Sequence, residues 1–145
     1  MTGGVVELTI PARDDMLLIA RMTLSGVCAR CGFGLDMLED ARIAADEACY
    51  CLTHQRAAAD ALRMTCSWDR GRLAIAFESI RAENADDPVQ TASLGEDAQS
   101  EALAKGILET LAASARLHSD ERGVYAIHME MDYNAGDAGE AYRGG

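Results

Sequence analysis

The side chains in this sequence with the widest range of chemistry are its cysteines. Cys28 and Cys31 have the spacing of a zinc knuckle, and Cys49 and Cys51 follow further along the chain with one residue between them. A strong zinc signal needs two pairs with knuckle spacing, so the sequence predicts no metal site. Cys51 could act as a redox thiol, but a small apolar residue on a partly buried helix face is the simpler interpretation.

The histidines offer a second kind of chemistry, because an imidazole can bind a metal ion or activate a neighbouring thiol. The three histidines are His54, His118 and His128. Their positions show no ligand spacing with one another, and nothing in the sequence singles out a catalytic Cys–His pair.

The composition of the chain excludes whole classes of partner. The 145 residues include 13 Lys and Arg against 24 Asp and Glu, which gives a formal net charge of −11. Nucleic acids and anionic membranes bind basic surfaces, so neither is an expected partner, whereas a protein with a basic patch is allowed. An odd number of cysteines and the lack of a signal sequence favour reduced thiols in the cytoplasm. The longest apolar stretch, residues 16–20, is far shorter than the roughly 20 residues of a membrane span.

The pattern of apolar and polar residues predicts the elements that would position these side chains. Apolar residues at helical spacing predict helices, in which Asp14 and Asp36 are expected to cap the first turns. Alternating or β-branched runs predict strands, and in the last of them Tyr125 is expected to share a buried face with Ile127. In chain order we expect a strand at 5–10, helices at 14–31 and 36–54, hairpin strands at 64–68 and 72–79, a long loop at 82–100, a helix at 100–117 and a strand at 123–133.

This order of elements predicts an α+β fold. We expect a two-layer α/β sandwich, in which a mixed sheet of about four or more strands is covered by helices on one face. Residues 1–133 are expected to form a single domain, and the Gly-rich residues 134–145 a flexible tail.

Several segments of the sequence resemble one known family. The strongest likeness lies in residues 38–54, which read Leu-Glu-Asp-Ala-Arg-Ile-Ala-Ala-Asp-Glu-Ala-Cys-Tyr-Cys-Leu-Thr-His. This segment resembles the N-box helix of the anti-sigma factor serine kinases, small bacterial relatives of the ATPase domains of histidine kinases, gyrase and Hsp90. Residues 6–12, 21–27 and 32–34 are also similar to that family. The resemblance implies the histidine kinase/Hsp90-like type of α/β sandwich, which agrees with the layout above.

The resemblance also implies roles for two residues of this helix. Glu47 matches the glutamate that acts in the family as the general base for the protein-substrate hydroxyl. Cys51 stands where the family has an asparagine that helps to hold Mg²⁺ on ATP. Positions i and i+4 share one helix face, so both side chains could point at one nucleotide. Sulfur is a poor ligand for a hard cation, so the metal-holding role is not expected here.

Two further nucleotide motifs of the family are altered in this chain. The adenine-binding motif, Asp-x-Gly-x-Gly, aligns with Ser79, Arg81 and Glu83, so its aspartate and both glycines are missing. Glu101, Ala102 and Ala104 occupy the positions of glycines that pack against the triphosphate, where glycine permits close backbone approach.

Charge works against a triphosphate at the second of these motifs. A carboxylate at Glu101 would repel a phosphate by roughly 4 kcal/mol at about 4 Å and an effective dielectric of about 20. Arg81 and Lys105 could offset part of this repulsion. With Mg²⁺, adenine and triphosphate contacts all altered, no cofactor is expected, and Glu47 is interpreted as a vestigial base or simply as a solvated helix glutamate.

We therefore expect an anti-sigma-factor-like regulator that acts by protein–protein binding rather than as an enzyme. An active protein serine kinase that uses ATP and Mg²⁺ in a rearranged site is the first alternative, and a small-ligand sensor that reuses the pocket is the second. By resemblance, the partners would be a sigma factor, an anti-anti-sigma-type protein, or both, and the chain would form a homodimer. Residues 14–31 and the strand before them are the expected contact face.

Overall fold

The computed structural model describes residues 3–55, 57, 59–81 and 94–133, and these form one sheet with helices packed against it. In chain order the elements are β1 (Gly4–Pro11), a single 3-10 turn at Asp14–Met16, α1 (Leu17–Cys31), α2 (Leu35–Thr53), β2 (Ala61–Asp69), β3 (Arg72–Ile80), α3 (Leu94–Leu111), β4 (Ser114–Asp120) and β5 (Gly123–Asp132). The α+β class and the two-layer sandwich are therefore confirmed.

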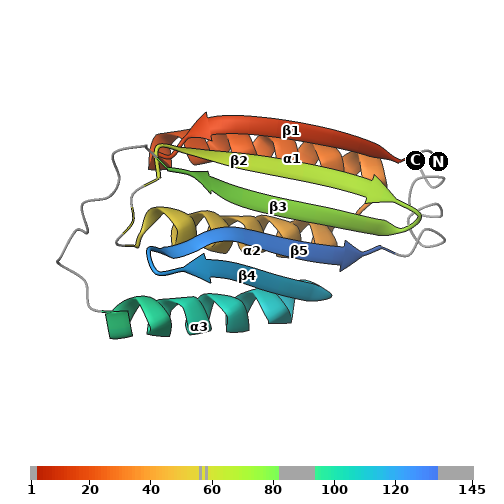
Figure 1. The fold of residues 1–145 in the computed structure, drawn as a ribbon. Helices are drawn as coiled ribbons and strands as arrows, with labels where there is room; N and C mark the ends of the chain where they lie inside the picture. The colour runs from red at the N-terminus through yellow and green to blue at the C-terminus, as the bar shows by residue number, and fades with distance from the viewer. Residues whose placement is uncertain (1–2, 56, 58, 82–93, 134–145) are drawn as a thin grey trace.

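The sheet has five strands in the order β1-β2-β3-β5-β4, and each neighbouring pair is antiparallel. The prediction of a mixed sheet was wrong, and the connections explain why (Figure 1). Two helices between β1 and β2 return the chain to the end where β1 finished, so β2 runs back alongside it. One helix between β3 and β4 makes those strands run the same way, but β5 lies between them.

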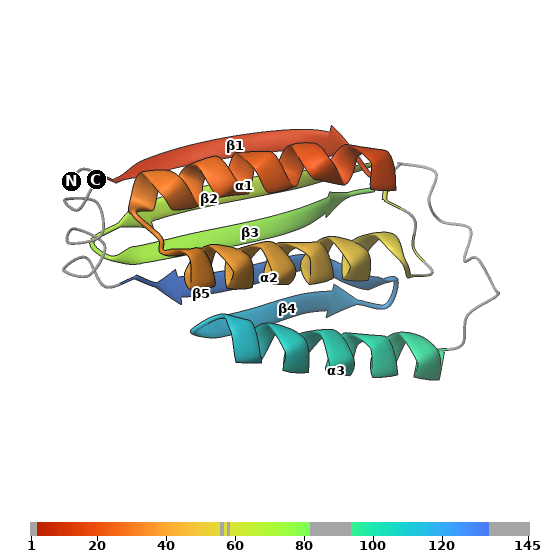
Figure 2. The same ribbon diagram turned by 180° about the vertical axis from the view of Figure 1, so that it is seen from behind.

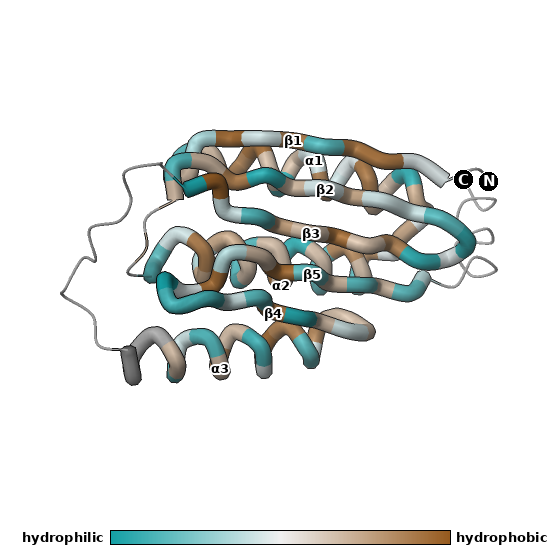
Figure 3. Tube along the Cα trace, viewed as in Figure 1, coloured by the Kyte–Doolittle hydropathy of each residue, from teal (hydrophilic) through white to brown (hydrophobic). Residues whose placement is uncertain are grey.

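The helices lie on one face of the sheet, as predicted (Figure 2). Between the two layers the strands contribute alternate residues to the core, and α1 and α2 contribute the stripes that face them. Figure 3 shows apolar stretches along the strands and a hydrophilic turn between β2 and β3. The central core residues include Leu24, Ala45, Ala48, Leu52, Leu62, Met64, Leu73, Ile75, Phe77, Ile127 and Met129.

The β2–β3 hairpin has the predicted turn. Arg70 and Gly71 both have positive φ, at 50° and 83°, which is the geometry of a two-residue type I′ turn. Gly32 also ends α1 as predicted, with φ of 81° in the left-handed region. The N-cap residues differ from the prediction of Asp14 and Asp36. Met16 is the N-cap of α1 and Gly34 that of α2, and neither side chain makes a capping hydrogen bond.

Two predicted boundaries were wrong. The helix predicted at 100–117 ends earlier in the structure, and the loop predicted at 82–100 also ends earlier, because a helix begins within that range. α3 begins at Leu94 and ends at Leu111, and residues 114–120 form the edge strand β4. Ala115 and Leu117 of β4 face the core, whereas Arg116 and His118 lie on the opposite face. Such alternation is typical of a strand, but the helical pattern just before it led the sequence prediction to extend the helix over these residues. Residues 82–93 and the predicted tail at 134–145 lie outside the described residues.

Tyr125 does not share the buried face of β5. The pairing of β4 with β5 shifts register between His118 and Ser119, opposite Tyr125. Such an irregularity re-aims a side chain, and Tyr125 is 41% exposed while Ile127 is fully buried.

No helix within the described residues is both long enough and apolar enough to cross a membrane.

Phe77→Ala should lower the free energy of unfolding by about 3–5 kcal/mol, because it deletes a ring that is 1% exposed on the central strand. Urea unfolding followed by circular dichroism measures the loss. Leu35→Ala is the control: that side chain is 84% exposed, so the change should stay within about 0.5 kcal/mol. Equal effects of the two substitutions would contradict the described core.

Candidate functional site

A cavity lies between the second half of α2 and the first half of α3, next to the start of β5. Its volume is about 220 Å³. α2 and the residues just after it form one wall, and α3 forms the other. The lining residues are Glu47, Tyr50, Cys51, His54, Gln55, Ser100, Glu101, Leu103, Ala104 and Val124.

Helical periodicity explains the α2 wall. Glu47, Tyr50, Cys51 and His54 follow the i, i+3, i+4, i+7 spacing of one helix face. A neighbouring stripe of the same helix, which includes Ala48, is buried in the core. Packing against the sheet therefore fixes the direction in which the polar face points.

An aromatic pair forms part of this wall. The rings of Tyr50 and His54 stack, with centroids 4.1 Å apart and an angle of 13° between their planes. Nδ1 of His54 lies 2.9 Å from the Thr53 hydroxyl and 3.2 Å from the Tyr50 carbonyl oxygen, so the ring is held against the end of α2.

Gln55 closes the cavity against β5. Its side-chain amide donates to the Val124 carbonyl over 2.6 Å and accepts from the Val124 N–H over 2.9 Å. The preceding residue, Gly123, has φ of 118°, and a Cβ at that position would lie 2.5 Å from Gln55 Oε1. A glycine is needed here both for the backbone conformation and for the close approach of the glutamine.

Among the described residues, two carboxylates and no lysine or arginine line the cavity. Glu101 accepts a hydrogen bond from the Ser119 hydroxyl over 3.2 Å. Within the described residues Glu47 has no recorded hydrogen bond or ion pair. Lys105 is paired instead with Glu109 at 3.9 Å, and Arg81 with Asp120 at 2.9 Å. The two basic residues that could have offset a phosphate charge are therefore absent from the lining.

The structure brings together four of the residues singled out from the sequence. Glu47, Cys51, Glu101 and Ala104 line this one cavity, although those on α2 and those on α3 are 50 or more positions apart in the chain. Ala102 is exposed and is not part of the lining. Their convergence follows from the packing of α3 against α2.

The residues aligned with the adenine-binding motif lie elsewhere. Ser79 is on β3 and Arg81 follows the end of that strand, and neither lines the cavity. The Ser79 hydroxyl and Arg81 Nε are buried with no hydrogen-bond partner among the described residues. Glu83 lies outside those residues.

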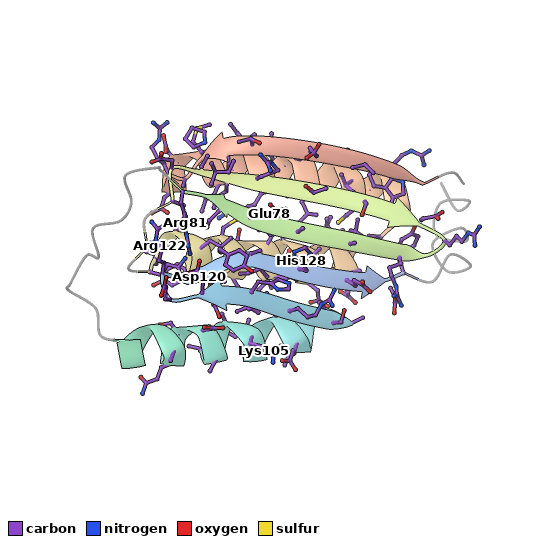
Figure 4. The ribbon with its side chains drawn as sticks, in the orientation of Figure 1. Glu78, Arg81, Lys105, Asp120, Arg122 and His128 are labelled. Carbon is purple, nitrogen blue, oxygen red and sulfur yellow. The ribbon has the colours of Figure 1, made fainter. Side chains whose placement is uncertain are left out.

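Arg81 instead anchors the turn between β4 and β5 (Figure 4). Its guanidinium donates to Asp120 over 2.9 Å and to the Gly123 carbonyl over 3.4 Å, and it lies 6.0 Å from the ring centroid of Tyr125. Burial alone would raise the pKa of Asp120. The Arg122 N–H and the Arg81 guanidinium outweigh this effect and leave the pKa of Asp120 below its ordinary value.

Six lining residues were not predicted as a site: Tyr50, His54, Gln55, Ser100, Leu103 and Val124. Tyr50 and His54 share the helix face of Glu47, so helical spacing could have found them. Nothing in the sequence links Gln55 to Val124, because that contact joins the end of a helix to a strand 69 positions away.

The cysteines are free thiols. Burial raises the pKa of Cys28, Cys49 and Cys66 to about 12, so these three thiols stay protonated near neutral pH. Cys51 is the partly exposed exception, at the cavity wall. Within the described residues no group of three or more His, Cys, Asp and Glu is arranged to hold a metal ion.

Comparison with known proteins supports the resemblance found in the sequence. The serine-protein kinase RsbW of Bacillus pumilus is 44% identical over 48 residues, which is 33% of this chain and 30% of the relative. The RsbW proteins of Bacillus velezensis and Bacillus subtilis are 48% and 46% identical over 44 residues, or 30% of this chain and 28% of each relative. About a third of this chain is thus similar to these serine-protein kinases.

The match is partial. It spans less than a third of the length of the relatives, and no protein-family model matches the chain.

Gln55→Ala should lower the free energy of unfolding by about 1–2 kcal/mol, because two hydrogen bonds to the Val124 backbone are lost. Gly123→Ala should also destabilise the protein, through backbone strain and a collision with Gln55. In the double variant the collision is gone, so the combined loss should fall short of the sum by about 1 kcal/mol. Urea unfolding of the four proteins measures this coupling, and additivity within about 0.5 kcal/mol would contradict the contact.

Proposed function

We propose that this chain is an anti-sigma-factor-like regulator that acts by binding a protein partner and does not bind ATP in the manner of the kinases it resembles. The observation that carries the proposal is the lining of the α2–α3 cavity. The resemblance implies that a triphosphate would sit here, yet the described part of the lining holds two carboxylates and no lysine or arginine. Negative charge on the wall repels a polyanion in a partly desolvated site.

The size of the cavity and the chemistry of the Cys51 thiol also argue against ATP and Mg²⁺ in this cavity. The cavity of about 220 Å³ is smaller than the roughly 300–1,000 Å³ of typical small-molecule pockets. Gln55, clamped on Val124, occupies the end of the cavity beside β5. The Cys51 thiol offers sulfur where Mg²⁺ requires oxygen.

The expected contact face for a partner is the outer side of α1 with β1. Leu18 and Met22 are 57% and 64% exposed one helical turn apart on α1. Val5 of β1 is 66% exposed on the other face of the sheet, because its neighbour Val6 packs against the core. Exposed apolar side chains at successive turns of one helix are typical of a protein-binding surface. We propose that the partner is a sigma factor, an anti-anti-sigma-type protein, or both. The strongly acidic chain would steer a basic partner toward it, and it would act as a homodimer in the cytoplasm.

One observation favours the alternative of an active serine kinase. Glu47 lines the cavity and has no recorded hydrogen bond or ion pair within the described residues, so its carboxylate is available as a general base. Nucleotide binding separates the two proposals.

Titration of the protein with a fluorescent ATP analogue and Mg²⁺ should show no saturation in the micromolar range. Glu101→Gln removes one of the two wall charges and should strengthen the residual binding. Glu109→Gln is the control: it removes a charge from the same helix at a residue outside the cavity lining, so it should not strengthen the binding. Micromolar affinity in the wild-type protein would overturn the proposal. Phosphate transfer to a protein substrate that is lost in Glu47→Gln would establish the kinase.

The tagged protein should capture a sigma subunit or a regulator of that circuit from its own cells, identified by mass spectrometry. The double substitution Leu18→Glu and Met22→Glu should reduce the capture at least tenfold, because it places two charges on the apolar contact face. Leu103→Glu is the matched control: that side chain is 66% exposed on α3, away from α1 (Figure 2). Equal loss in the control, or full capture by the α1 variant, would contradict this contact face.

A further inference from the structure

The face of the sheet that the helices leave uncovered carries a second group of polar side chains. Figure 1 is seen from this side, with the strands in front of the helices. Strand register aligns Thr65 of β2 with Ala76 of β3, Ala76 with His128 of β5, and His128 with Arg116 of β4. The four residues therefore form one row across the sheet.

Small side chains leave a hollow in the middle of this face. Its volume is about 140 Å³, and its floor is formed around Ala74 and Ala76. A liquid water molecule occupies about 30 Å³, so the hollow has room for a small ion. The polar residues around it are Thr65, Ser67, Ser114, Arg116, His128 and Glu130.

Arg116 at the rim has no recorded acidic partner. Within the described part of the chain it is the one arginine for which no hydrogen bond or ion pair is found, in a protein with nearly twice as many acidic as basic residues. Its direct cross-strand neighbour is His128, which is also basic. When His128 is protonated, two like charges stand directly opposite each other, an arrangement that destabilises a sheet.

A second histidine adds to the same group. The rings of His118 and His128 meet edge to face, with centroids 5.0 Å apart. Burial lowers the pKa of His128, and His118 and Arg116 lower it further, while Glu78 of β3 acts in the opposite direction. Figure 4 shows His128 on the uncovered face of the sheet.

The acidic residue at the hollow does not neutralise this group. Glu130 is paired with Arg72 at 2.8 Å, and Arg72 also bonds Asp132 at 2.9 Å. Three basic side chains thus converge beside hydroxyl groups with no recorded anionic partner for Arg116. Residues that break a local stability rule without visible compensation are typical of functional positions.

We propose that this hollow binds a phosphate group, either as the free ion or as a monoester, through Arg116 and His128 with the hydroxyls of Thr65, Ser67 and Ser114, while His118 packs against the His128 ring. A guanidinium fork matches two oxygens of a phosphate, and further donors on β2, β4 and β5 surround the hollow. A planar carboxylate has two oxygens and would leave most of these donors unused. The site lies on the opposite face of the sheet from the helices, so the inference is independent of the proposed function.

Histidine resonances followed by NMR provide the test, with phosphate compared against chloride at equal ionic strength. A bound dianion stabilises the imidazolium form, so phosphate should raise the titration midpoint of His128 by about one pH unit. Binding should weaken as pH rises through the titration of His128, because its positive charge is lost. The absence of a difference between phosphate and chloride would overturn the proposal.

Variants separate this site from general charge attraction. Arg116→Gln should weaken phosphate binding about tenfold or more, because a charge-assisted hydrogen bond is lost. Arg42→Gln, on the helix side of the molecule, removes the same charge and should leave the affinity unchanged. His128→Gln, with circular dichroism to verify folding, should weaken binding as well. Equal affinity in Arg116→Gln and Arg42→Gln would overturn the proposal.

The source of the phosphate is distinguished by the probe. Phosphoserine that binds more tightly than inorganic phosphate would establish a monoester ligand. Equal or weaker binding of phosphoserine, with inorganic phosphate still bound, would establish the free ion. Failure of both probes would exclude the site.

Discussion

The packing of α2 against the sheet is the constraint on which the rest of the structure depends. Ala41, Ala45, Ala48 and Leu52 bury one stripe of this helix over β3 and β5. Alanines let the helix approach the sheet closely, and the close approach fixes its rotation. The adjoining face, with Glu47, Tyr50, Cys51 and His54, is then left to form a cavity wall once α3 packs alongside.

The same constraint separates two chemistries on opposite faces of the sheet. On the helix side, the cavity presents carboxylates, a thiol and a stacked aromatic pair. On the uncovered side, Arg116, His118 and His128 converge beside hydroxyl groups. A chain with a net charge of −11 thus carries its clearest basic cluster on the face farthest from the cavity expected from its relatives.

Ion pairs in this protein position the chain and contribute little to stability. Arg81 holds Asp120 at the β4–β5 turn, and Arg72 bridges β3 to two carboxylates of β5. Most of these groups are well exposed, so each pair contributes modestly. Stability comes from the apolar layer around Leu52, Phe77 and Ile127, where side chains are fully buried.

The sequence by itself determined the two-layer class, α1, α2 and the β2–β3 hairpin, because periodicity and turn residues such as Gly71 act over short distances. The sequence also indicated four cavity residues, because helix spacing and the likeness to a known family can be read without the fold: Glu47, Cys51, Glu101 and Ala104. Tertiary structure decided the rest: β4 became a strand because β5 was available to pair with it, and antiparallel order followed from β5 lying between β3 and β4. Contacts such as Gln55 with Val124, or Arg116 with His128, join residues whose proximity depends on packing and register, which no local pattern records.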